Sequence, residues 1–202
     1  MRYMDEQMVS MRANIRATLD RLGIDTHNDK NFQDTAKRFL NYLISYMQPY
    51  DPGTDLGTTF PPKKKETSNA YDRSIVVQVG IPYRAVCAHH LLPVLGTAHV
   101  GYLPRNKLVG LSKLTRLVYG ISHALPSLQE DVCDQITDAI MTHLDAQGAM
   151  CVISAEHGCM AARGVEEASG CIDTVTSSVK GIFIDKHEAR QEFFSMIQVG
   201  GG

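Results

Sequence analysis

Apolar residues recur at helical spacing in the first fifty residues of the chain. One stripe ends at Gly23, a residue typical of a helix C-terminus, and consists of Met4, Met8, Met11, Ile15, Leu19 and Leu22. A second stripe begins near Asp34 or Thr35, ends before Pro49, and consists of Ala36, Phe39, Leu40, Leu43, Ile44 and Met47. The two stripes predict an N-terminal arm of amphipathic helices.

The periodicity stops between residues 48 and 69, where Pro, Gly, Asp, Thr and Lys dominate. We interpret this segment as a loop that joins the helical arm to the main body. This boundary predicts two regions, residues 1–70 with the arm and loop, and residues 71–202 with the main body. The basic run from Lys63 to Lys65 is interpreted as a solvated surface run.

The rest of the chain predicts alternating strands and helices. β-branched runs predict strands at 74–79, 94–103, 149–155 and 174–184. Helical spacing predicts helices at 112–124 and 128–144, and a short closing helix over the last dozen residues. This order indicates the α+β class, with helices on one face of an antiparallel sheet.

Composition and charge narrow the functional classes. The chain has 202 residues, 44% of them apolar, and a net charge of -2, so it lacks the basic excess typical of nucleic-acid or membrane-surface binding. Five scattered cysteines and a charged start argue against a secreted disulfide framework and predict a cytoplasmic protein. The longest uncharged stretch, 85–104, contains three histidines and two prolines, which excludes a membrane helix.

Two short segments carry metal-ligand chemistry. Cys87 stands just before the pair His89 and His90, and His157 stands two residues before Cys159. Three ligands of the Cys, His, Cys type leave one tetrahedral position open, as in catalytic zinc sites. The spacing alone fits a protein without a metal equally well, with the cysteines as small buried apolar residues and the histidines hydrogen-bonded within the protein or at its surface.

A second constellation suits an anion. Ser112 falls at the predicted start of a helix, with Lys113 and Arg116 one turn apart beside it, which is typical of a phosphate site. A capped helix with a solvated basic face explains the same residues. Glu130 is favourable in the first turn of the next helix for dipole reasons alone, and Arg163 is either an anion partner or a surface arginine.

Five segments in order resemble the GTP cyclohydrolase I family: CAHHLLPVLGTAHVGYLP, GLSKLTRLV, LQEDVCDQI, EHGCMAARGV and TVTSSVKGIF. The resemblance runs from about Ile75 to the end and extends more weakly to DTAKRFLNYL. It implies the tunnelling fold, in which two antiparallel helices pack on a four-stranded antiparallel sheet. It also implies a homodecamer with active sites between subunits.

The resemblance also implies a zinc-dependent reaction on GTP. Cys87, His90 and Cys159 match the family's zinc ligands, and His89 and His157 match its two proton carriers. The implied reaction is hydrolysis of the imidazole ring of guanine, which gives formate and 7,8-dihydroneopterin triphosphate.

The remaining matches concern the substrate. Gln129 and Glu130 match the pair that reads the guanine edge. The residues that match the triphosphate-binding groups are Ser112, Lys113, Arg116 and Arg163, and the resemblance also gives Ser112 a part in the later catalytic steps.

Two departures from the family pattern leave alternatives open. Ala88 stands where the family usually has Glu, and the stretch from Arg116 to Gln129 is one residue longer than in familiar bacterial members. A degenerate member that binds a nucleotide or a partner without turnover is therefore a second hypothesis. A tunnelling-fold enzyme acting on a pterin or deazapurine is a third.

Overall fold

The structure is a computed structural model that describes residues 4–62, 74–162 and 172–200. It divides into two compact units, Met1–Pro49 and Tyr50–Gly202. The predicted boundary at residue 70 falls in 63–73, outside the described residues, so the division into 1–70 and 71–202 stays a prediction. The run from Lys63 to Lys65 lies outside them too.

The first unit contains the two predicted N-terminal helices, α1 (Asp5–Arg21) and α2 (Thr35–Ser45), packed against each other. The backbone turns after α1 at Gly23, where φ is +85°, a conformation that costs glycine little. Both helices are confirmed within a few residues of the predicted bounds.

The second unit begins with secondary structure that the sequence analysis missed. The segment 48–69 was predicted to be a loop, but it contains α3 (Pro52–Leu56) and β1 (Thr59–Phe60), which pairs with β4 (Leu108–Val109). The Asp51 side chain accepts a hydrogen bond from the Gly53 amide at 2.9 Å, and Pro52 takes the first helical position. The loop prediction was wrong because such a short helix shows no periodicity.

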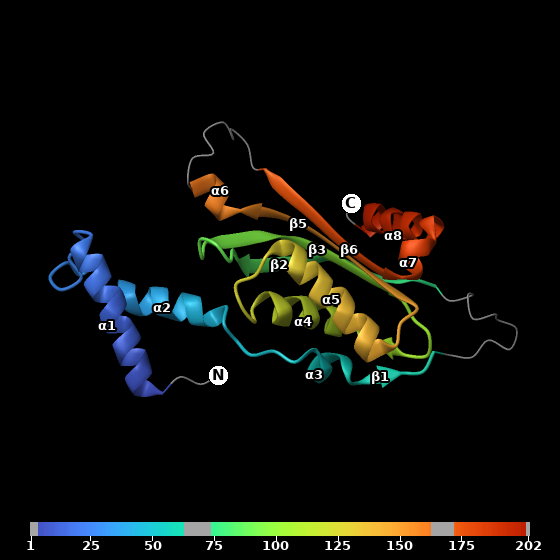
Figure 1. Cartoon of the computed structure of the whole chain (residues 1–202), viewed down its shortest axis with the longest axis horizontal. Helices are drawn as coiled ribbons and strands as arrows, with labels where there is room; N and C mark the ends of the chain where they lie inside the picture. Colours follow the sequence, from blue (N-terminus) through green and yellow to red (C-terminus); the bar gives the residue numbers. More distant parts are fainter. Residues whose placement is uncertain (1–3, 63–73, 163–171, 201–202) are drawn as a thin grey trace, which may run out of the picture. The chain divides into compact units, whose positions relative to one another are not determined.

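The main body is a four-stranded antiparallel sheet in the order β2-β3-β5-β6. Its strands are β2 (Val76–Val86), β3 (Pro93–Leu103), β5 (Gly148–His157) and β6 (Asp173–Gly181). The helices α4 (Leu111–Ser122) and α5 (Gln129–Leu144) run antiparallel to each other along one face (Figure 1). The expected α+β tunnelling-fold arrangement is confirmed.

The main core fills the space between this sheet and its two helices. Tyr83 and Tyr102 from the sheet and Leu117 and Ile136 from the helices are almost fully buried there. This packing fixes the N-terminus of α5 against β5 and β6.

The C-terminal segment covers part of the other sheet face. The predicted strand 174–184 ends at Gly181, because a φ of +61° turns the chain into α7 (Ile182–Asp185). The strand prediction was therefore wrong for its last three residues. The predicted closing helix is α8 (His187–Gly200), whose Phe193 packs on Phe183 in a second small core. Within the described ranges, no helix combines the length and apolarity that crossing a bilayer requires.

Candidate functional site

The turn between β2 and β3 places a histidine beside a cysteine. Cys87 donates its amide hydrogen to the Leu92 carbonyl and accepts one from the Leu91 amide, both at 3.0 Å. Leu91 adopts φ +55°, which tightens the turn. As a result His90 folds back, and its Nδ1 lies 3.8 Å from the Sγ of Cys87.

The third potential ligand arrives from a distant part of the chain. In the β3–β5 pairing, Val94 stands opposite His157, the last residue of β5. The chain then enters the short helix α6 (Gly158–Ala162), which carries Cys159 to the β2–β3 turn. The Sγ atoms of Cys87 and Cys159 are 3.8 Å apart.

These three side chains have the chemistry and spacing of a metal site. Their ligand atoms all lie within 4.8 Å of one another. Two sulfurs bound at about 2.3 Å to a tetrahedral zinc ion are about 3.8 Å apart, which matches the spacing of Cys87 and Cys159. Two thiolates and an imidazole also suit a borderline-soft cation. Cys87 is buried, Cys159 is half-buried and His90 is exposed, so one side of the cluster is open to solvent.

A buried amide holds the neighbouring histidine. Gln129, which is 3% exposed, donates both hydrogens of its Nε2 to backbone carbonyls, those of Ile153 at 3.1 Å and Thr174 at 2.9 Å. Its Oε1 therefore faces the Nε2 of His157, 2.9 Å away. Since an amide oxygen only accepts, the network assigns the proton to Nε2 and leaves Nδ1 as the basic nitrogen.

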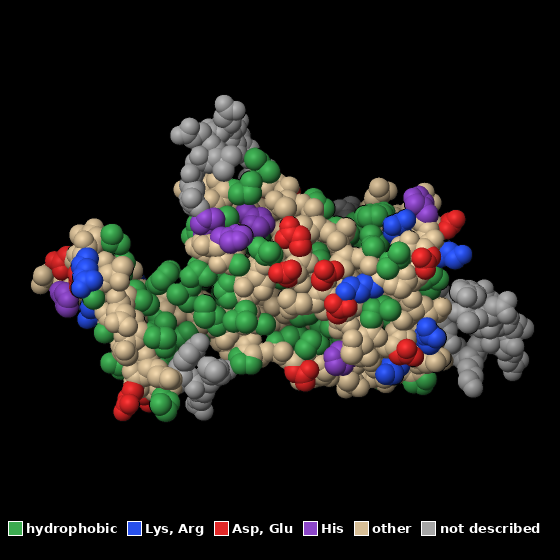
Figure 2. Space-filling view, in the orientation of Figure 1, with side chains coloured by type: hydrophobic (Ala, Val, Ile, Leu, Met, Phe, Trp, Pro, Cys, Tyr) green, Lys and Arg blue, Asp and Glu red, His purple; other side chains and the backbone are tan. Residues whose placement is uncertain are grey.

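The other two residues expected at this end are exposed. His89 lies in the β2–β3 turn next to His90, with ring centroids 6.1 Å apart, and Glu130 occupies the first turn of α5. Figure 2 shows histidine side chains gathered on the surface beside α6 and the β2–β3 turn, with acidic side chains nearby. The exposed His89 and His90 thus share the β2–β3 turn, while Glu130 stands next to Gln129, which holds His157.

The expected phosphate-binding cations lie on α4 and have a partner that the sequence analysis missed. Ser112 is exposed in the first turn of α4, where the motif predicted a helix start. Asp55 of α3 lies 3.5 Å from the Lys113 Nζ and 3.8 Å from Arg116, and its Oδ2 accepts a hydrogen bond from the Tyr50 hydroxyl at 3.1 Å. The Asp55 side chain is only 14% exposed.

These cations lie at the opposite end of the sheet from the cysteine cluster. Thr115 of α4 accepts a hydrogen bond from Gln78 at 2.7 Å, near the start of β2. Cys87 follows nine residues later, just past the end of β2, at most about 30 Å away at the usual rise per residue. The structure therefore brings together Cys87, His90 and Cys159 with His157, but not with Lys113. Arg163, the fourth expected anion partner, lies outside the described residues.

Fold and site together define a tunnelling-fold protein with a Cys-His-Cys cluster that could hold a metal. The family model described as GTP cyclohydrolase I matches residues 11–198. The chain belongs to the GTP cyclohydrolase I family, which confirms the resemblance seen in its motifs.

Individual relatives agree with this assignment over nearly the whole chain. The chain is 36% identical over 197 residues to GTP cyclohydrolase 1 of Wolinella succinogenes, covering 96% of this chain and 100% of the relative. It is 38% identical over 186 residues to GTP cyclohydrolase 1 of Carboxydothermus hydrogenoformans, covering 91% of each. Among solved structures, the apo form of an archaeosine synthase QueF-Like aligns with a TM-score of 0.43 and 10% identity, over 57% of this chain and 97% of that chain.

Proposed function

We propose that this protein is a zinc-dependent GTP cyclohydrolase I that converts GTP and water to formate and 7,8-dihydroneopterin triphosphate. The observation that carries the proposal is the convergence of Cys87, His90 and Cys159 beside the oriented His157. Ala88 is exposed in the turn, and the three ligands converge without an acidic side chain at that position. This arrangement favours an active enzyme over a degenerate binding module.

The metal ligands are Cys87, His90 and Cys159. When bound there, zinc would lower the pKa of water and so supply hydroxide near neutral pH. Cys87 would hold the ion from the buried side, and the exposed His90 would leave the approach open to substrate.

His157 and His89 move protons during ring opening. The Nε2 of His157 donates to Gln129, so proton exchange with the substrate falls to Nδ1. Gln129 acts as a positioning residue, since all three of its amide bonds go to the protein. A direct hydrogen bond between Gln129 and guanine stays a prediction.

Recognition of guanine falls to Glu130. Its exposed carboxylate, one residue from Gln129, accepts hydrogen bonds from the ring N–H and the exocyclic amine of guanine, a pair that adenine does not offer. Glu130→Ala should therefore raise the KM for GTP while changing the melting temperature little. A variant whose main defect is stability would remove Glu130 from the site.

The triphosphate is bound by Ser112, Lys113 and Arg116 of a second copy of the chain, and Arg163 is the fourth expected phosphate-binding group. The separation of up to about 30 Å along β2 supports a site that is completed between subunits, in a homodecamer as the family resemblance implies. Ser112 also assists the later steps of the reaction.

The direct test is turnover of GTP by the purified protein, with and without prior chelation of zinc. Formate and the near-ultraviolet absorbance of the pterin product are followed together. We expect both to form only in the metal-loaded protein. Absence of turnover by zinc-loaded, assembled protein contradicts the proposal.

A mixing experiment tests the shared site. Cys159→Ser and Lys113→Met should each be inactive alone. When the two are unfolded, mixed and reassembled, random assembly should create intact sites in about a quarter of positions and restore activity accordingly. Each variant reassembled alone is the control. A mixture as inactive as its components would place both residues in the site of one copy.

A further inference from the structure

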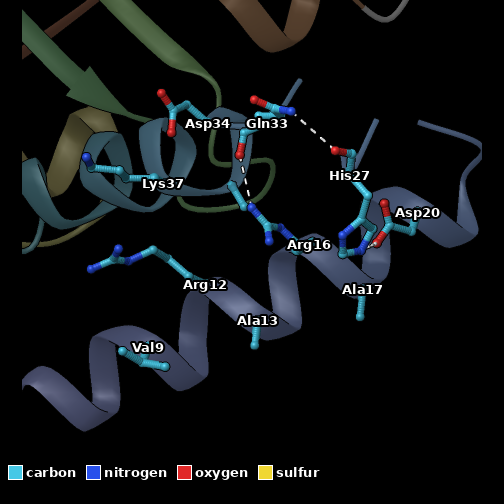
Figure 3. A pocket seen from close by; sticks show the side chains of 11 residues that line it. Val9, Arg12, Ala13, Arg16, Ala17, Asp20, His27, Gln33, Asp34 and Lys37 are labelled. Carbon is cyan, nitrogen blue, oxygen red and sulfur yellow. Dashed lines mark hydrogen bonds and ion pairs between the residues drawn. The ribbon is translucent and has the colours of Figure 1, made fainter. Parts of the chain in front are cut away.

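A cavity of about 440 Å³ lies in the N-terminal unit, between α1 and the start of α2. Three cations line it: Arg12 and Arg16, one turn apart on α1, and Lys37 from α2 (Figure 3). Like charges four residues apart on a helix repel each other. Against these three cations the lining has two carboxylates, Asp20 and Asp34, so it carries a positive excess in a protein whose net charge is slightly negative.

The two carboxylates in the lining are engaged with other groups. Asp20 accepts hydrogen bonds from the Thr26 hydroxyl at 2.6 Å and its amide at 3.1 Å, and lies 3.2 Å from the His27 ring. The Thr26 hydrogen bonds lower the pKa of Asp20, which stays ionised beside His27. Asp34 lies 3.7 Å from Arg38. Within the described ranges, neither carboxylate forms an ion pair with Arg12 or Lys37.

The two arginines differ in what they contact. An Nη of Arg16 donates to the Gln33 carbonyl at 3.0 Å, which fixes that guanidinium at the cavity wall. The Nε of Arg12 is buried, yet it has no hydrogen-bond partner within the described part of the chain. Buried N–H groups are rarely left unsatisfied in proteins. Figure 3 shows the head groups of Arg12 and Lys37 extending toward the same side of the two helices.

We propose that this cavity binds the phosphoryl group of a small phosphorylated molecule, with Arg12 and Lys37 contacting the phosphate oxygens. A guanidinium presents a planar set of N–H donors that matches phosphate geometry, and several cations suit a doubly charged group better than a single carboxylate. Small apolar side chains, Ala13 and Ala17 on α1 and Ala36 on α2, leave room for the organic part of the ligand. This site is separate from the proposed triphosphate groups, which belong to the other unit.

The test is hydrogen–deuterium exchange of the full-length protein with inorganic pyrophosphate as the probe. We expect pyrophosphate to slow exchange in peptides of α1 and α2. Arg12→Gln and Lys37→Gln should each weaken the apparent affinity about tenfold or more, because each removes a charged hydrogen bond. Arg21→Gln is the matched control, since Arg21 is an exposed arginine of α1 that does not line the cavity.

Three results would overturn the proposal. The first is unchanged exchange of α1 and α2 at millimolar pyrophosphate. The second is protection that persists in both Arg12→Gln and Lys37→Gln. The third is protection that vanishes in Lys113→Met, which would mean that it is transmitted from the proposed triphosphate groups. The test measures exchange and not cyclohydrolase activity, so its result does not depend on whether the proposed function is correct.

Discussion

The Oε1 of Gln129 lies 2.9 Å from the Nε2 of His157, and this bond is oriented by two backbone carbonyls on the other side of the same amide. The relationship joins the start of α5 to the end of β5. Through it, a buried polar side chain orients a half-buried histidine.

Replacing this amide should separate positioning from proton transfer. In Gln129→Met, the buried Ile153 carbonyl and the half-buried Thr174 carbonyl lose their donor and His157 loses its acceptor, so we expect a loss of about 1–3 kcal/mol in unfolding free energy. The single-turnover rate should fall by roughly tenfold, less than the 10²–10⁴ expected for His157→Ala. The pH profile of kcat should also shift, because the tautomer of His157 is no longer fixed.

Asp131→Asn is the matched control for that experiment, since Asp131 is exposed in the same turn of α5. It should leave stability, rate and pH profile unchanged. If Gln129→Met loses stability but keeps the wild-type rate and pH profile, Gln129 has a purely structural role.

Cysteine substitutions should remove metal and activity together. Cys159→Ser or Cys87→Ser takes one thiolate from the cluster, so metal content measured by mass spectrometry should fall from about one ion per chain to near zero. Cys133→Ala is the control, because Cys133 is a buried cysteine of α5 whose Sγ contacts the Thr176 hydroxyl instead. Retention of full activity in either ligand variant would refute the metal assignment.

The carboxylate of Asp55 should compete with the substrate. Asp55→Asn keeps an acceptor for Tyr50 but removes a negative charge next to Lys113 and Arg116. Since the triphosphate then meets two cations without a competing anion, we expect the KM for GTP to fall several-fold with little change in kcat. An increase in KM would show instead that Asp55 is needed to hold Lys113 in place.

Stability should decrease in mild acid through His99 of β3. Its Nδ1 accepts a hydrogen bond from the Gly80 amide at 3.3 Å, at the point where the β2–β3 register shifts, and burial lowers its pKa. The unfolded chain therefore binds the proton more readily than the folded one. The stability contribution is complete above the unfolded pKa of about 6.5 and is lost as the pH falls through the lower folded pKa.

Urea unfolding at pH 8.0 and pH 5.5 checks this sign. The wild-type protein should be less stable at pH 5.5, and His99→Gln should show a smaller difference between the two values. Part of the difference should remain, because burial also lowers the pKa of His123. An equal difference in both proteins would exclude His99 as a source.

The features that the sequence predicts are those that depend on the spacing of residues close together in the chain. Apolar stripes predicted α1, α2 and α5. Cys87 and His90 are three residues apart, so a single tight turn is enough to bring their side chains together. Residue type also singled out Cys159 as a potential ligand, but no local pattern links it to Cys87. Long-range pairing of β3 with β5 creates that contact.

The missed features depend on neighbours distant in sequence. Asp55 gains importance only because α3 packs beside α4, and its five-residue helix is too short for a periodic signal. Gln129 and Glu130 are adjacent in the first turn of one helix, and the sequence does not distinguish the buried side chain from the exposed one. Gly181 ends β6 through a positive φ within a run that otherwise favours a strand.

The sequence separation of 72 between Cys87 and Cys159 should also set the order of events during folding. Closing so long a loop has an entropic cost, and without the β3–β5 pairing the unfolded chain holds two thirds of the cluster at best. High-affinity metal capture would therefore be a late step that follows formation of the sheet. An ion that binds only the folded chain in turn stabilises it, by about 4 kcal/mol at a thousandfold excess over its Kd. Metal supply would then govern how long the protein persists as well as how fast it works.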